Sequence, residues 1–183
     1  MRAAMSALLL IALALGSLPV KAEQPKLEMH RVGVNVGDGS GWYLAKSTKG
    51  SFSVRLPIPF NDFTTYDAGT GSASHVVGGK STEGVKFAAV ETPITAATAD
   101  LESIPKAFSS NPSNKVSDVA RNMRDGADTL SFAVDGPSSG GYFRYIRTKE
   151  RMYMLSIEYP KAYRELATAN RDKFFASFEL SGK

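Results

Sequence analysis

The chain has 183 residues, of which 22 are lysine or arginine and 18 are aspartate or glutamate, so its formal net charge is +4. This small excess of positive charge is spread along the chain, which argues against nucleic-acid binding. The chain contains no cysteine, which excludes disulfides, a thiolate nucleophile and a cysteine-based zinc site.

The first 22 residues have the three parts of a cleavable secretory signal peptide. Arg2 supplies a positive charge, Leu8–Leu15 is an unbroken apolar run, and Val20 and Ala22 fit a signal peptidase site. The apolar run is shorter than the roughly 20 residues that cross a bilayer. We therefore predict cleavage after Ala22 and a soluble periplasmic or secreted protein. Two basic residues and no acidic one are removed, so the mature chain of 161 residues has a net charge of +2.

Residues 23–49 are interpreted as an N-terminal segment that precedes the main domain. The stretch up to about Met29 is polar and is expected to be frayed. Gly37–Gly41 (GDGSG) predicts a flexible turn ahead of Trp42. This turn has one carboxylate, too few for a calcium loop, and it lacks the strand and helix of a dinucleotide-binding motif.

Residues 50–183 are interpreted as one domain of mostly β structure. Ser51–Ile58 alternates apolar and polar side chains, which predicts a strand. Three further strands are predicted in this half of the chain: Asp62–Tyr66, Ser74–Val77 and Gly84–Thr92. Gly78-Gly79 and Glu83-Gly84 are predicted to be turns.

Two helices are predicted in the middle of the chain. The first is short, is capped by Thr98 or Asp100, and ends near Phe108 because Pro105 limits it. The second rests on a partial helical pattern over Val116–Met123.

The last third has the clearest pattern. Thr129–Asp135 alternates and predicts a strand, and Tyr142–Arg147 with Met152–Tyr159 predicts a hairpin. The hairpin carries apolar residues on both faces, so its sheet is expected to be covered on both sides. Lys161–Phe178 predicts a closing helix, whose apolar face would consist of Tyr163, Leu166, Ala167, Phe174 and Phe178. The predicted fold class is therefore α+β, an antiparallel β-sheet covered by helices on both faces.

Three stretches resemble motifs of the PsbP-like superfamily of α/β/α sandwich domains. They are Gly50–Pro57 (GSFSVRLP), Arg151–Ile157 (RMYMLSI) and Lys173–Leu180 (KFFASFEL), and they occur in the order found in that family. The family includes extrinsic photosystem proteins, a Ran-binding protein and many exported bacterial proteins of unknown role. The resemblance implies a non-enzymatic binding domain, and it supplies no binding motif that can be assigned to residues of this chain.

A hydrolase is the alternative from another class. Gly136–Gly140 (GPSSG) matches the G-x-S-x-G motif, with Ser138 as the nucleophile. A nucleophile elbow is followed directly by a helix, whereas here a strand is predicted to follow. A catalytic triad would have to recruit His75, because His30 lies near the frayed end.

The other candidates for chemistry are two histidines and three acids. His30 and His75 lack the spacing of a metal site, so no metal ion and no cofactor is predicted. Asp125, Asp128 and Asp135 lie around the two ends of one predicted strand. A pair of them is conceivable for glycoside chemistry, but loop and capping roles explain them equally well.

The predicted hairpin is the first place to look for a partner surface, because tyrosine and arginine are favoured at interfaces. Its candidate residues are Tyr142, Arg144, Arg147 and Arg151. The sequence thus predicts an exported, non-catalytic binding or accessory protein whose partner is another envelope or extracytoplasmic protein, or a small ligand. A small-ligand carrier that uses a cleft between sheet and helices remains a further alternative.

Overall fold

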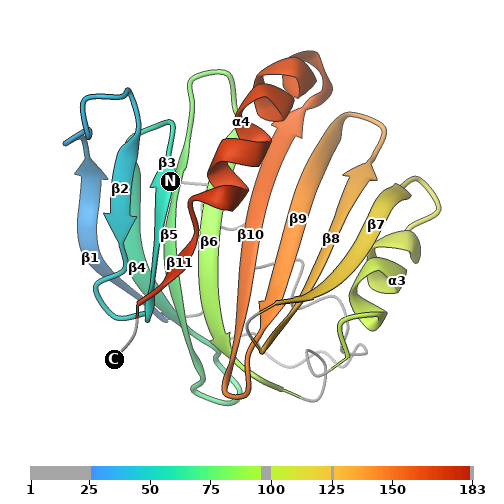
Figure 1. Ribbon diagram of the computed structural model, residues 1–183, viewed down its shortest axis with the longest axis horizontal. Coiled ribbons are helices and arrows are strands. Elements are labelled where there is room, and N and C mark those ends of the chain that lie inside the picture. Colours follow the sequence, from blue (N-terminus) through green and yellow to red (C-terminus); the bar gives the residue numbers. More distant parts are fainter. Residues whose placement is uncertain (1–25, 96–99, 125, 182–183) are drawn as a thin grey trace.

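Two antiparallel sheets form the protein in the computed structural model (Figure 1). The structure describes residues 26–95, 100–124 and 126–181, so the predicted signal peptide and its cleavage site lie outside the described residues. The larger sheet has eight strands in the order β1-β4-β5-β6-β10-β9-β8-β7. In chain order its strands are β1 (Lys26–Val34), β4 (Phe60–Tyr66), β5 (Ala73–Lys80), β6 (Lys86–Pro93), β7 (Lys115–Arg124), β8 (Ala127–Asp135), β9 (Ser139–Arg147) and β10 (Arg151–Pro160).

The smaller sheet and two helices pack around the larger sheet. The smaller sheet has the order β11-β3-β2, with β2 at Tyr43–Lys46, β3 at Phe52–Leu56 and β11 at Glu179–Leu180. Helix α3 spans Ser103–Ser109, and α4 spans Arg164–Ala176 after a short 3-10 turn at Lys161–Tyr163. Both β1 and β2 come from the segment before residue 50, and they pair with β4 and β3 respectively.

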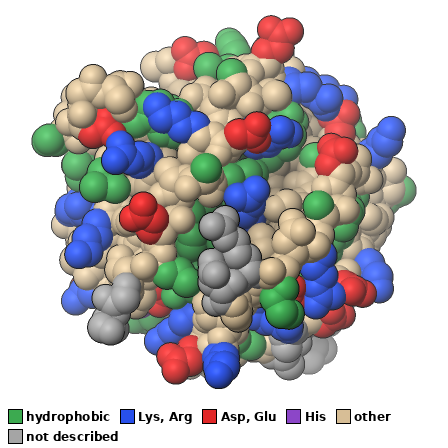
Figure 2. Space-filling view, viewed as in Figure 1, with side chains coloured by type: hydrophobic (Ala, Val, Ile, Leu, Met, Phe, Trp, Pro, Cys, Tyr) green, Lys and Arg blue, Asp and Glu red, His purple; other side chains and the backbone are tan. Residues whose placement is uncertain are grey.

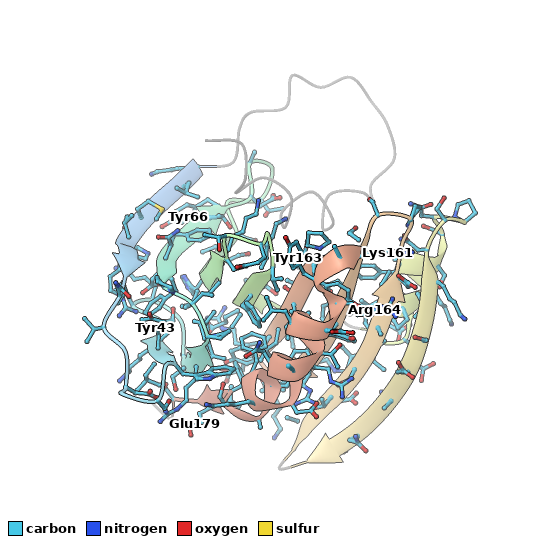
Figure 3. The ribbon with its side chains drawn as sticks, turned by 90° about the horizontal axis from the view of Figure 1, so that it is seen from above. Tyr43, Tyr66, Lys161, Tyr163, Arg164 and Glu179 are labelled. Carbon is cyan, nitrogen blue, oxygen red and sulfur yellow. The ribbon has the colours of Figure 1, made fainter. Side chains whose placement is uncertain are left out.

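One face of the larger sheet is covered by α4 and the smaller sheet. The alternation in β10 directs four apolar side chains to this face: Tyr153, Leu155, Ile157 and Tyr159. They pack with Phe52, Val54 and Leu56 of β3, which are fully buried as the alternation of that strand predicts. Seen along the strands, α4 lies between β8 and β7 on one side and, on the other, the small sheet marked by Tyr43 and Glu179 (Figure 3).

The opposite face carries a second, smaller core. Leu130, Phe132 and Val134 of β8 lie on this face, as their alternation predicts, together with Phe143 of β9. The ring of Phe108 on α3 packs 5.3 Å from that of Phe132 and 4.8 Å from that of Phe143. The predicted antiparallel sheet with helices is therefore confirmed, whereas the predicted covering of both faces by helices is not. Helix α3 has only seven residues, and its aromatic contacts are at one end of the sheet.

Three local predictions are wrong. Residues 115–124 form strand β7 rather than a helix; a register shift between Ser117 and Ala120 breaks the alternation there and so produces a partly helical spacing. The N-terminal stretch is not frayed from Lys26 onward, because it is hydrogen-bonded along β4. Gly78-Gly79 is not a turn but part of β5, where a Cβ on Gly78 would lie 2.7 Å from the carbonyl oxygen of Phe87. Only glycine allows the two strands to approach so closely there.

The closing helix is present, but its apolar face differs from the predicted one. Ala167 and Phe174 are fully buried, and Phe178 packs beyond the end of the helix on Phe52 and Tyr153. Tyr163 and Leu166 are each 40% exposed. The buried face of α4 also includes Phe175, so it is turned toward β9 more than the predicted spacing indicated.

Candidate functional site

A shallow cleft opens beside α4, where β9, β8 and β7 extend beyond the helix. Its volume is about 180 Å³. Strands β7, β8 and β9 and helix α4 supply its lining. The lining residues are Asp118 of β7, Phe132 and Ala133 of β8, Tyr142 and Arg144 of β9, and Arg171, Asp172 and Phe175 of α4. Positive and negative side chains are interspersed over this face of the protein (Figure 2), so no charge of a single sign dominates it.

Arg144 is the most constrained charged residue of the cleft. Its Nε donates to Ser131 Oγ at 3.1 Å and its Nη1 donates to the carbonyl oxygen of Phe175 at 3.3 Å. The guanidinium also lies 4.7 Å from the centroid of the Phe175 ring. Burial lowers the pKa of Arg144, since the charged form is removed from water. Strand β9 places the side chain here because Tyr142 and Arg144, two residues apart, share the face that α4 covers.

The second arginine of the cleft comes from α4. Arg171 lies 5.2 Å from the centroid of the Tyr142 ring, and its Nε donates to Asp172 Oδ1 at 2.8 Å. The Tyr142 hydroxyl is hydrogen-bonded to Thr168 Oγ1 at 2.7 Å, which orients the ring against the helix. Two guanidinium groups, each stacked on an aromatic ring, therefore flank one small cavity. Such an arrangement suits a planar anionic group with an apolar body.

The four residues predicted as a partner surface fall into three places. Tyr142 and Arg144 line the cleft. Arg147 is three residues further along β9 and so points to the opposite face, where its Nη2 lies 3.0 Å from Asp128 Oδ2. Arg151 lies at the start of β10 and pairs with Glu91, 3.6 Å away. The hairpin thus brings together only the first two of these residues.

The acids considered for glycoside chemistry are counter-charges to arginines. Asp128 is buried and accepts hydrogen bonds from Arg121 and Arg147, and the bond from Arg121 is the main reason that the pKa of Asp128 is lowered. Asp135 lies at the other end of β8 and pairs with Arg164 at 2.9 Å. The two carboxylates are seven residues apart on one strand, so they face opposite sides of the sheet. Asp125 lies outside the described residues.

The serine motif does not meet a histidine. Ser138 is exposed in the turn between β8 and β9, and β9 follows it directly instead of a helix. Its carbonyl oxygen accepts from the backbone N–H of Lys161, which places it beyond the end of β10. His75 lies level with Tyr153, near the start of β10. Tyr153 and Lys161 are eight residues apart, which corresponds to about 25 Å along the strands. Ser138 and His75 are therefore separated by about that distance in the strand direction.

Both histidines instead converge on one buried threonine, which sequence reasoning did not predict. His30 Nε2 lies 2.8 Å from Thr64 Oγ1, and His75 Nδ1 lies 3.0 Å from the same oxygen. Burial lowers the pKa of His75. Beside it on the sheet, Glu91 accepts a 2.6 Å hydrogen bond from the backbone N–H of Ser51. The sequence feature that could have predicted this cluster is a row of polar residues at inward-facing strand positions, which includes Asp62 and Thr64 of β4 and Glu91 of β6.

This polar row is buried and largely satisfied, so it stabilises the fold under the β2–β3 loop rather than forming an accessible site. Thr64 is 1% exposed and Glu91 is 3% exposed. Nearby, Asp62 is fully buried, and its Oδ2 accepts from Arg31 and Thr48. Within the described ranges, no group of three or more histidine, aspartate or glutamate side chains is arranged to hold a metal ion.

No family model and no curated protein matches the sequence. Solved structures that match include cyanobacterial PsbP (CyanoP) from Synechocystis sp. PCC 6803, with a TM-score of 0.45 and 11% identity over 82% of this chain and 97% of that chain. CyanoP bears the name of the superfamily that the three sequence motifs resemble.

A second match is LpqN of Mycobacterium tuberculosis, which is described as involved in cell envelope biogenesis. Its TM-score is 0.35, with 11% identity over 87% of this chain and 85% of that chain. These similarities concern the fold, and they transfer neither ligand nor partner to this protein. In the part of the chain that the structure describes, no helix is long and apolar enough to cross a membrane.

Proposed function

We propose that this protein is an exported, non-catalytic binding or accessory protein that holds its partner or ligand at the cleft between α4 and β9. The observation that carries the proposal is the cleft itself, where Arg144 and Arg171 each stack on an aromatic ring beside a cavity of about 180 Å³. Pockets that combine aromatic walls with a few placed charges are typical of ligand sites. Export is supported by the succession of charged, apolar and small residues in the first 22 positions.

The alternative of a hydrolase is not favoured by the geometry. Ser138 and His75 are about 25 Å apart along the strands, and Asp128 and Asp135 face opposite sides of the sheet. The second candidate that an observation favours is a small-ligand carrier, because the cleft is small and lies between sheet and helix, as that alternative requires. We further infer that α3 and α4 cover opposite faces of the sheet in the manner of a PsbP-like sandwich, which the contacts of Phe108 on one face and Phe174 on the other support.

The test uses the mature chain, residues 23–183, as bait in a native envelope extract. We expect it to capture a specific protein or small molecule, identified by mass spectrometry, and the double variant Arg144→Gln/Arg171→Gln to lose that capture. The matched control is Arg164→Gln, which removes an arginine on the same helix that pairs with Asp135 outside the cleft. Capture that is equal in all three proteins would place the binding surface elsewhere, and turnover of an ester or peptide substrate would contradict a non-catalytic role.

A further inference from the structure

We propose that the cleft between α4 and β9 binds a single carboxylate group, held by the guanidinium of Arg144. The inference rests on the proposed binding function and names the chemistry of its ligand.

Arg144 is the one arginine without a carboxylate partner among those whose side chains the structure describes. The other seven each have an aspartate or glutamate oxygen within 4.0 Å: Arg31, Arg55, Arg121, Arg147, Arg151, Arg164 and Arg171. Arg144 is nevertheless half-buried, and its pKa is lowered by burial, whereas that of Arg171 is raised by its hydrogen bond to Asp172. A cation removed from water is unfavourable unless an anion compensates it. Asp172 attracts Arg144 electrostatically, which partly offsets the effect of burial on the pKa of Arg144, but it forms no ion pair with the guanidinium. An anion from outside the chain would supply that direct contact.

The donors of Arg144 are already positioned for such an anion. Two of its five N–H groups are used, by Ser131 Oγ and by the carbonyl oxygen of Phe175. Together with the stacking on the Phe175 ring, these bonds hold the guanidinium in one orientation. The Nη2 group makes no hydrogen bond within the described residues, and Nη1 keeps a second hydrogen. The two oxygens of a carboxylate match the spacing of such a pair of nitrogens.

The surroundings of Arg144 limit the charge and size of the ligand. Asp118 and Asp172 also line the cleft, and they would repel a second negative charge, which disfavours a phosphate dianion. A volume of about 180 Å³ corresponds to roughly six water molecules, enough for a carboxylate with a short apolar body. The Tyr142 and Phe175 rings provide apolar walls for that body. The ligand chemistry is thus a monocarboxylate, either a free small acid or the carboxyl terminus of a peptide.

The experiment titrates the mature chain with sodium benzoate and, separately, with inorganic phosphate, observed by ¹H–¹⁵N NMR of the backbone and the arginine Nε groups. We expect benzoate to shift the Arg144 Nε and Phe175 signals saturably, and phosphate to bind more weakly. Losing a charge-assisted bond predicts that Arg144→Gln binds benzoate roughly 10- to 100-fold more weakly. Arg164→Gln, whose arginine pairs with Asp135, should bind as the original protein does. A short peptide with a free carboxyl terminus, compared with its amidated form, separates the two sources of the carboxylate.

Benzoate shifts that do not saturate, or that are equal in Arg144→Gln, would overturn the carboxylate site. Tighter binding of phosphate than of benzoate would overturn the ligand class. These outcomes are separate from failure of the proposed function. If the envelope extract yields a partner that depends on the cleft while benzoate does not bind, the binding function stands and the carboxylate inference falls.

Discussion

Replacing Phe174 by alanine is expected to destabilise the protein strongly, because this ring joins the closing helix to the sheet. Phe174 is fully buried, and its ring packs edge-on against that of Phe87 on β6, with 5.5 Å between centroids. Removing a buried phenylalanine ring costs about 3–5 kcal/mol, whereas whole domains are stable by only about 5–15 kcal/mol. In a domain of this size each kcal/mol lowers the melting temperature by roughly 2–4 °C. The expected decrease is therefore about 6–20 °C.

The assay is thermal unfolding of the mature chain followed by circular dichroism, with urea unfolding as a second measurement of stability. Leu166→Ala is the matched control, since Leu166 lies on the same helix but is 40% exposed. Its change in stability is expected to stay within about 0.5 kcal/mol, as for other surface substitutions. A Phe174→Ala protein that melts within two or three degrees of the original (about 1 kcal/mol) would refute the packing argument.

A truncation extends the same reasoning to the whole closing segment. Ending the chain at Tyr159 removes α4 and β11, and it uncovers the apolar side chains of β3 and β10 that they bury. With no disulfide to hold the remainder, we expect an insoluble fragment. Cooperative folding of that fragment, with a melting temperature close to that of the full mature chain, would show that the helix is not part of the core.

Three further predictions concern processing, catalysis and pH. N-terminal sequencing of the extracytoplasmic protein is expected to begin at Glu23; a chain that starts at Met1 would contradict the signal peptide. Ser138→Ala is expected to leave any activity and the melting temperature unchanged, because Ser138 lies in an exposed turn with no histidine nearby; loss of a hydrolase activity at unchanged stability would contradict a binding role. Burial lowers the pKa of His75 from 6.5, so below pH 6.5 the unfolded chain takes up a proton that the folded chain does not, and stability should decrease as the pH is lowered through that range. His75→Asn, whose amide can still reach Thr64, is expected to flatten this dependence, whereas equal slopes in the two proteins would rule out His75 as its source.

The sequence alone was sufficient for strands in which apolar and polar side chains alternate regularly and one face is buried. The alternation over Ser51–Ile58 predicted the buried face of β3, and the pattern over Thr129–Tyr159 predicted β8 and the β9–β10 hairpin. In such segments every second side chain is buried, so the alternation of apolar and polar residues in the sequence predicts both the strand and its buried face. The three family-like motifs also consist mainly of core-packing residues, two of them in strands and the third at the end of α4 and in β11, so they carry information on packing and not on a site.

Tertiary structure alone decided the features that depend on which strands become neighbours. β7 has a helix-like spacing because a register shift against β8 displaces its alternation, and β1 forms by pairing with β4, a distant segment of the chain. The meeting of His30 and His75 at Thr64 results from the pairing of three strands, two of which are more than 30 residues apart in the chain. The position of α4 over β9 likewise decides that Arg144 packs on Phe175 and forms no ion pair with a carboxylate of the described residues. Local sequence determines which residues point the same way along a strand, but only the register between distant elements determines which charges meet.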